Sequence, residues 1–230
     1  MGAKARGGGH SEEAEENVFW VTMSDMMLGL AIVFIALFVT AMTGFSSQTV
    51  QQQKAQQEVS NKISEQIKKN ELAADVDEMT GDLTISNVEL FELGSSELTE
   101  NGKKLLDKVI PIYVNSIFTE KDLTEAIEHI VVQGHTDSQM FAGVNSKDEQ
   151  WLRNMDLSTK RANSVAQYIF RTHFDKQYNE KLKKVMVVEG MSFNKPVLVD
   201  GKEDFGKSRR VEIKLQVTTW DVMKALGLKR

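Results

Sequence analysis

One long apolar run dominates the hydrophobic pattern near the start of the chain. Between Val18 and Phe45 the only ionisable residue is Asp25. Because about 20 apolar residues of helix cross a bilayer core about 30 Å thick, this run predicts a single transmembrane helix over residues 18–45. The run is longer than the core of a cleaved signal peptide, and an acidic segment precedes it where such peptides are basic. We therefore expect an uncleaved anchor.

The residues on either side of the predicted span are polar. Residues 1–17 contain three consecutive glycines and then a run of glutamates, which predicts a flexible tail. Residues 46–80 are rich in glutamine, and Val59, Ile63 and Ile67 recur every fourth residue. This spacing predicts a helical linker with a thin apolar stripe, which could pair with a second copy of the chain.

Beyond Gly81 the pattern becomes that of a globular domain over residues 81–217. Apolar residues alternate with polar ones as in strands, or recur every third or fourth residue as in helices. Strands are predicted at 82–92, 130–132, 185–188 and 211–217, and helices at 98–113 and 157–174. This order predicts an α/β (α+β sandwich) domain with a mixed sheet and helices on one face. A C-terminal tail, 218–230, follows, with a short helix predicted at 220–228.

Composition and charge exclude several classes of function. The formal net charge is −5 and the basic residues are not concentrated on one face, which argues against nucleic acid as a partner. The chain has no cysteine, which excludes disulfides, thiolate metal sites and a cysteine nucleophile. It has no nucleophile elbow or phosphate-binding loop, and His135 has no second histidine at ligand spacing. We expect no enzyme, no metal site and no cofactor.

The carboxylate inside the predicted span is the most informative single residue. Placing Asp25 near the middle of a bilayer costs on the order of 2.5–3.5 kcal/mol on insertion scales, so it needs a compensating role. One interpretation is a cap near the headgroups, with the charge reaching water. However, small and polar residues share its helix face: Thr22, Gly29, Ala36 and Thr40. Small residues let a second helix approach closely, so we interpret Asp25 as a sheltered carrier of protons or sodium ions.

Several motifs of the C-terminal half together resemble the OmpA-like peptidoglycan-binding family, in the order typical of that family. They are FELGSSELT at 91–99, VQGHTD at 132–137, NMDLSTKRA at 154–162 and SRRVEI at 208–213. The resemblance covers about residues 82–217 and implies that this domain binds peptidoglycan.

The resemblance also implies which residues bind the wall. Peptidoglycan stem peptides carry a carboxylate and an amine on one diamino acid, which an anion and a fork-shaped cation can bind together. In the family these are an aspartate and an arginine, which fall here on Asp137 and Arg161. Asn154, Ser158 and Arg209 match further positions that line the same site. Without the ordered motifs, the charged residues among them would each be interpreted as part of a surface ion pair.

The span and the domain together resemble the MotB family of motor stator subunits. Residues 20–27, WVTMSDMM, place an aromatic residue before an aspartate as in that family, and the long segment 138–153 is similar to its enlarged loop. The resemblance implies a parallel homodimer inside a ring of a multi-span, MotA-like A subunit, with ions passing at Asp25. It also implies a bacterial inner-membrane location with the N-terminus cytoplasmic and the domain periplasmic.

The sequence leaves open which machine the chain serves. Flagellar MotB proteins usually carry a plug and a longer linker, often with proline, whereas residues 46–80 contain no proline. The compact design is more similar to the B subunit of the Zorya antiphage defence system; a flagellar stator and another ion-driven motor are the alternatives. A passive tether between membrane and wall is the alternative from another class. Asp25 argues against it, because a tether gains nothing from a buried carboxylate.

Overall fold

The computed structural model describes the backbone of residues 9–218 and the side chains of residues 18–42, 50 and 53–218. The chain forms two compact units, residues 1–49 and 50–230. The helix expected at 220–228 lies outside the described residues.

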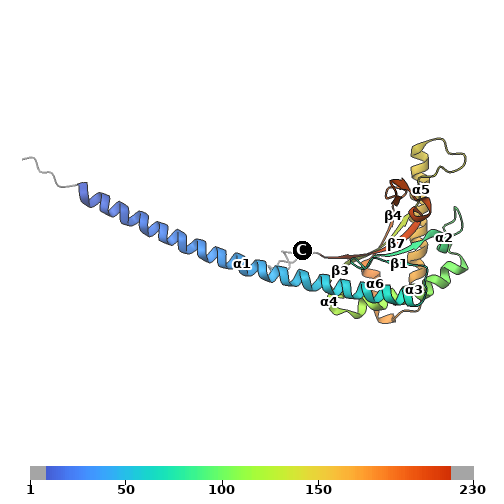
Figure 1. Cartoon of the computed structure of the whole chain (residues 1–230), viewed down its shortest axis with the longest axis horizontal. Coiled ribbons are helices and arrows are strands. Elements are labelled where there is room, and N and C mark those ends of the chain that lie inside the picture. Colours follow the sequence, from blue (N-terminus) through green and yellow to red (C-terminus); the bar gives the residue numbers. More distant parts are fainter. Residues whose placement is uncertain (1–8, 219–230) are drawn as a thin grey trace, which may run out of the picture. The chain divides into compact units, whose positions relative to one another are not determined.

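The first unit holds the N-terminal part of helix α1, which runs from Gly9 to Lys69 (Figure 1). Within it, Val18–Met42 has a mean hydropathy of 2.3 and exposed side chains throughout. A helix of this length and composition can cross a bilayer. α1 also includes residues 9–17, where the sequence pattern predicts a flexible tail. Glutamates are good helix formers and are favourable near a helix N-terminus, so the acidic run can extend the helix.

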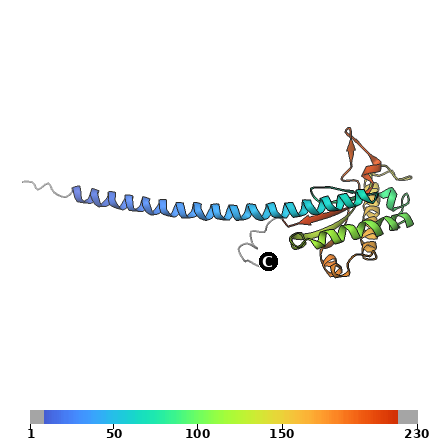
Figure 2. The same ribbon diagram turned by 60° about the horizontal axis from the view of Figure 1, so that its bottom comes forward.

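Residues 50–69 of α1 belong to the second unit, where the end of the helix packs beside helix α3, Glu100–Thr119 (Figure 2). Val59, Ile63 and Ile67 are at most 3 % exposed and join the hydrophobic core. The neighbouring stripe is polar and holds the loop that follows at 77–82: Gln56 Nε2 donates to the Thr80 carbonyl (2.6 Å), and Lys68 Nζ lies 3.0 Å from a Glu78 carboxylate oxygen. The apolar stripe therefore packs within the chain, whereas its spacing in the sequence was also compatible with pairing to a second copy.

We expect Ile63→Ala to lower the free energy of unfolding of the domain by about 2–5 kcal/mol, the range typical of a large buried side chain cut to alanine. Ile63 is fully buried. Glu65→Ala, at an exposed position of the same helix, is the matched control and should change stability by less than about 0.5 kcal/mol. Chemical denaturation of both variants measures the difference. Equal stability of the two would show that α1 does not pack on the domain.

A five-stranded mixed sheet forms the centre of the domain, in the order β1-β2-β7-β3-β4. β3 and β4 pair in parallel, and the other neighbours are antiparallel. The strands are β1 Asp75–Val76, β2 Leu83–Ser86, β3 Ile127–His135, β4 Met186–Gly190 and β7 Arg210–Val217. A separate hairpin pairs β5, Leu198–Val199, with β6, Lys202–Glu203.

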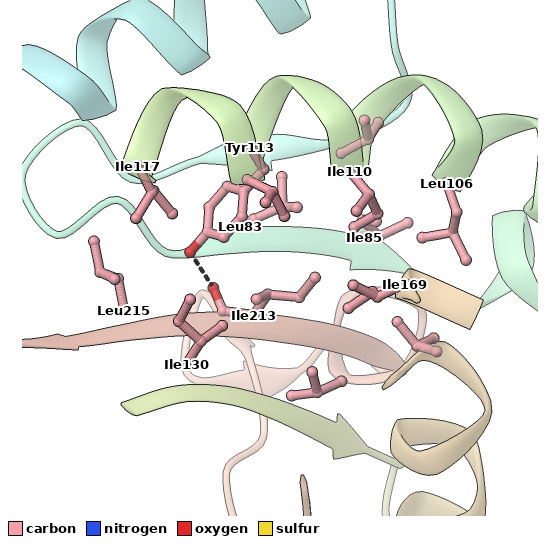
Figure 3. Packing of buried hydrophobic residues seen from close by; sticks show 14 of the residues in the cluster. Leu83, Ile85, Leu106, Ile110, Tyr113, Ile117, Ile130, Ile169, Ile213 and Leu215 are labelled. Atoms are coloured by element: carbon pink, nitrogen blue, oxygen red, sulfur yellow. Dashed lines mark hydrogen bonds between the residues drawn. The ribbon is translucent and has the colours of Figure 1, made fainter. Parts of the chain in front are cut away.

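Helices α3 and α5, Lys147–Ile169, pack on one face of this sheet and close the core between them (Figure 3). Tyr113 of α3 reaches across the core and donates its hydroxyl to the Ile213 carbonyl of β7 at 3.3 Å. Complete burial raises the pKa of this phenol well above its ordinary value. The remaining helices are α2 Asn87–Leu90, α4 Lys121–Ala126, α5 Lys147–Ile169, η1 Lys176–Tyr178, α6 Asn179–Val185 and α7 Phe205–Ser208. The predicted fold class, a mixed sheet with helices on one face, is confirmed.

Two predicted elements have different bounds in the structure. The strand expected over 82–92 ends at Ser86, because Asn87 donates its backbone N–H to the Arg209 carbonyl and its side chain to the His135 carbonyl, which turns the chain into α2. The helix expected from Leu157 begins ten residues earlier, at Lys147, where Ser146 caps it by accepting from the Glu149 N–H. Only residues 138–146 of the enlarged loop are therefore irregular.

Candidate functional site

Two glycines allow α5 to lie directly on the sheet. Gly134 of β3 and Gly190 of β4 are paired in register. A Cβ atom on Gly134 would come within 2.1 Å of the Ser158 carbonyl oxygen, and one on Gly190 within 2.0 Å of Thr159 Oγ1. Any side chain at either position would push the helix away. This close approach brings the middle of α5 over the end of β3, where the chain continues into Thr136 and Asp137.

A cavity of about 280 Å³ opens at this point, where the end of β3, helix α5 and the segment before β7 meet. Four of the five predicted wall-binding residues line it: Asp137, Asn154, Arg161 and Arg209. Its other walls are the Leu93–Gly94 turn and apolar side chains of the 138–146 segment and α5, among them Met140, Phe141 and Leu157. The cavity is therefore a charged pocket with an apolar rim.

Ser158, the fifth predicted wall-binding residue, is not among the residues that line the cavity. It is fully buried, its hydroxyl donates to the Met155 carbonyl at 3.0 Å, and it accepts the backbone N–H of Ser192 at 3.0 Å. Ser192 in turn donates its hydroxyl to the Trp151 carbonyl and accepts the Thr136 N–H. Ser158 thus ties α5 to the segments around the cavity, and it does not line the cavity itself.

Asp137 is paired within the chain. One of its carboxylate oxygens forms an ion pair with Nη1 of Arg209, and the other accepts the backbone N–H of Gln139 at 3.1 Å. Sequence reasoning expected Asp137 to act beside Arg161. The structure instead pairs Asp137 with Arg209. His135 of β3 lies opposite Arg210 of the antiparallel strand β7, so the residues that follow His135 lie beside the residue that precedes Arg210.

Arg161 is held in a fixed position on α5. Its side chain is almost fully buried, Nε donates to the Ser95 carbonyl at 2.8 Å, and the guanidinium lies 5.3 Å from the centre of the Phe91 ring. Burial, and to a lesser degree the positive charge of Arg209, lower the pKa of Arg161 to about 10, although the negative charge of Asp137 opposes both effects. This buried cation would be stabilised by an anion bound in the cavity.

His135 lies behind the cavity and is fully buried. Its Nε2 is 3.4 Å from a carboxylate oxygen of Glu212, and burial lowers its pKa, which favours the neutral imidazole. Burial also raises the pKa of Glu212, but the contacts with His135, Lys214 and Arg210 outweigh it and leave that pKa below its ordinary value. Within the described residues, His, Asp and Glu side chains form no group of three that could hold a metal ion.

The predicted ion carrier lies in the other unit. Asp25 is exposed on α1, within the apolar segment Val18–Met42. The two threonine hydroxyls of the predicted small and polar face bond within the helix, since Thr22 donates to the Val18 carbonyl and Thr40 donates to the Ala36 carbonyl. The surface around Gly29 is open, with no atom within 4 Å of the position a Cβ would take.

Comparison with known proteins agrees with this architecture. The Zorya protein ZorB of Escherichia coli is 29 % identical over 212 residues, which are 87 % of this chain and 88 % of ZorB. The protein YtxE of Bacillus subtilis is 30 % identical over 174 residues, covering 73 % of this chain and 62 % of YtxE. A MotB-like protein from Desulfovibrio vulgaris has a similar fold, with a TM-score of 0.53 at 20 % identity, over 74 % of this chain and 96 % of that one.

The part of the chain that holds the cavity matches a known protein family. The model of the OmpA family matches residues 90–210, which include both glycines under α5 and the four predicted wall-binding residues that line the cavity. The expected resemblance to the OmpA and MotB proteins is confirmed, and with it the expectation of a protein that is not an enzyme. The match spans more than half of the sequence, so this chain belongs to the OmpA family.

Proposed function

We propose that the chain is the B subunit of an ion-driven stator complex in the bacterial inner membrane. One observation carries the proposal: a carboxylate in an apolar helix, Asp25, stands on the same chain as an OmpA-family domain with a charged cavity. The span carries protons or sodium ions at Asp25, in contact with a multi-span A-type subunit. The domain, on the periplasmic side, binds peptidoglycan through the cavity and keeps the B subunits from turning.

The machine that we propose is antiphage defence of the Zorya type. Its support is the similarity to ZorB, which extends over most of both chains. A flagellar stator is the second candidate, supported by the MotB-like fold. A passive membrane-to-wall tether would need the same domain. Asp25 favours an ion-driven stator over such a tether, because only an ion carrier has a use for a carboxylate in lipid.

The chain acts as a parallel homodimer in this proposal. Two lone carboxylates facing lipid are costly, and a surrounding ring of A subunits would shelter both. Because Val59, Ile63 and Ile67 pack inside the domain, that stripe is not the dimer contact, and we place the contact nearer the membrane.

Co-purification tests the proposed assembly. We expect the full-length chain, expressed with the multi-span protein of its gene neighbourhood, to purify with that protein and in fewer copies. Since the chain has no cysteine, single cysteines at the exposed positions Gln53, Lys54 and Gln57 should trap dimers in membranes, whereas a cysteine at Ile63 should not. A stable monomer that carries ions without a partner would contradict the proposal.

A further inference from the structure

A groove of about 390 Å³ lies between the last turns of α1 and helix α3, which are side by side (Figure 2). Val59 of α1 and Pro111 and Ile112 of α3 supply its apolar surface. Within the described part of the chain, the side chains of Lys62, Ser116 and Glu120 form no hydrogen bond or ion pair. The groove therefore has apolar surface and polar groups that are free to contact a partner. Its polar lining is Lys62, Gln66, Asn115, Ser116, Thr119 and Glu120.

The chain leaves the domain close to the end of the groove that the last turn of α3 forms. Thr218, the last residue that the structure describes, donates its backbone N–H and its hydroxyl to the Ala126 carbonyl at the end of α4. Thr124 ties α4 to the end of α3, since its hydroxyl donates to the Ile117 carbonyl at 3.3 Å. The six residues of α4 span about 9 Å as a helix, and the chain beyond Thr218 can extend over about 40 Å. Residues 219–230 can therefore reach every part of the groove.

The sequence of residues 219–230 suits a groove between two helices. Trp220, Met223 and Leu226 recur every third residue, which puts large apolar side chains on one face of the helix expected at 220–228. This helix would be about 14 Å long, and the wall that residues 111–120 form is about 15 Å long. An amphipathic helix of this size can lay its apolar face along the groove.

Charge favours the same placement. Residues 219–230 contain three basic residues and one acidic residue. The surface that they must cross, residues 120–128, contains four carboxylates and one lysine, and none of these five side chains is buried. Opposite charges on the two segments would draw the C-terminal residues toward α4 and the end of α3.

We propose that residues 219–230 dock as an amphipathic helix in this groove of their own chain. Trp220 lies at the end of the groove near Glu120, Met223 lies over Ser116, and Leu226 lies toward Ile112. The docked helix contacts α1 and α3 together, so it strengthens the attachment of α1 to the domain that the buried α1 stripe begins. This intramolecular contact depends neither on ion conduction nor on wall binding.

Disulfide trapping in the full-length protein in detergent tests the inference, since the natural chain has no cysteine. Ser116→Cys combined with Met223→Cys should form an intramolecular disulfide at least about fivefold faster than two control pairs. One control replaces Met223→Cys by Asp221→Cys, on the opposite face of the expected helix. The other replaces Ser116→Cys by Lys108→Cys, at an exposed position of α3 outside the groove. Equal rates in the three pairs, or a disulfide that joins two chains, would overturn the inference.

Maleimide labelling of Ser116→Cys gives a second measurement. A chain that ends at Thr218 should be labelled at least about fivefold faster than the full-length chain, whereas labelling of Lys108→Cys should be the same in both. Leu226→Asp in the full-length chain puts a carboxylate on the apolar face and should raise the Ser116→Cys rate as truncation does. Melting temperatures show that each variant is folded. Equal labelling of Ser116→Cys with and without Leu226→Asp would exclude docking in this groove.

Discussion

Asp25→Asn is expected to abolish ion flux while membrane insertion and assembly with the A-type subunit stay normal. The amide has the shape of the carboxylate but cannot take up and release a proton, and it binds a cation more weakly. Asp25 is the only ionisable residue between Val18 and Met42, so no neighbouring carboxylate can replace it. Flux into vesicles that contain the assembled complex, and protection of cells against phage, measure the loss.

Two controls make this test specific. Asp25→Glu keeps the titrating group and should retain part of the flux, since the carboxylate only moves by one methylene. Asp122→Asn applies the same chemical change to an exposed carboxylate of α4 and should leave flux unchanged. Normal flux and protection in Asp25→Asn would exclude the ion-carrier role and would favour a passive tether.

The regular elements of the domain could be predicted because their patterns are local. The alternation in β7 and the helical spacing along α5 both follow from one face meeting the core, and both were found with errors at the ends. The Val59, Ile63 and Ile67 stripe shows the limit of this reasoning. A stripe of three residues indicates that a helix face will be buried, but the pattern carries no information on what covers it, and the cover proved to be the domain of the same chain.

The candidate site could be predicted only in part, for a similar reason. Ordered motifs located Asp137, Asn154, Arg161 and Arg209, and all four line one cavity. The pairing among them depends on strand register, because Asp137 and Arg209 are distant in sequence and meet only where β3 ends opposite the start of β7. Ser158 shows the reverse case, since its motif position suggested the cavity wall and the close approach of α5 to Gly134 buries it instead.

The second large effect is expected at Arg161. Arg161→Ala should weaken binding to isolated cell walls by about 2–5 kcal/mol, because it removes the one buried cation that has no carboxylate partner among the described residues. That range corresponds to a loss of about 30-fold to several thousand-fold in affinity. Arg161→Lys keeps the charge but loses the planar fork and the Ser95 contact, so an intermediate loss is expected.

The control for this prediction lies on the same helix. Arg153→Ala removes an exposed arginine that pairs with Glu149 one turn earlier, and surface pairs of this kind contribute little, so wall binding should be unchanged. Arg161→Ala could lose wall binding because a wall contact is removed or because the domain is destabilised, since the variant also loses the Ser95 and Phe91 contacts that help to fix α5. The melting temperature of the variant distinguishes these two causes. A variant that melts as the wild type does and still binds the wall fully would place the binding site outside this cavity. Loss of binding in a folded Arg161→Ala, with Arg153→Ala unaffected, would assign the wall contact to the buried cation.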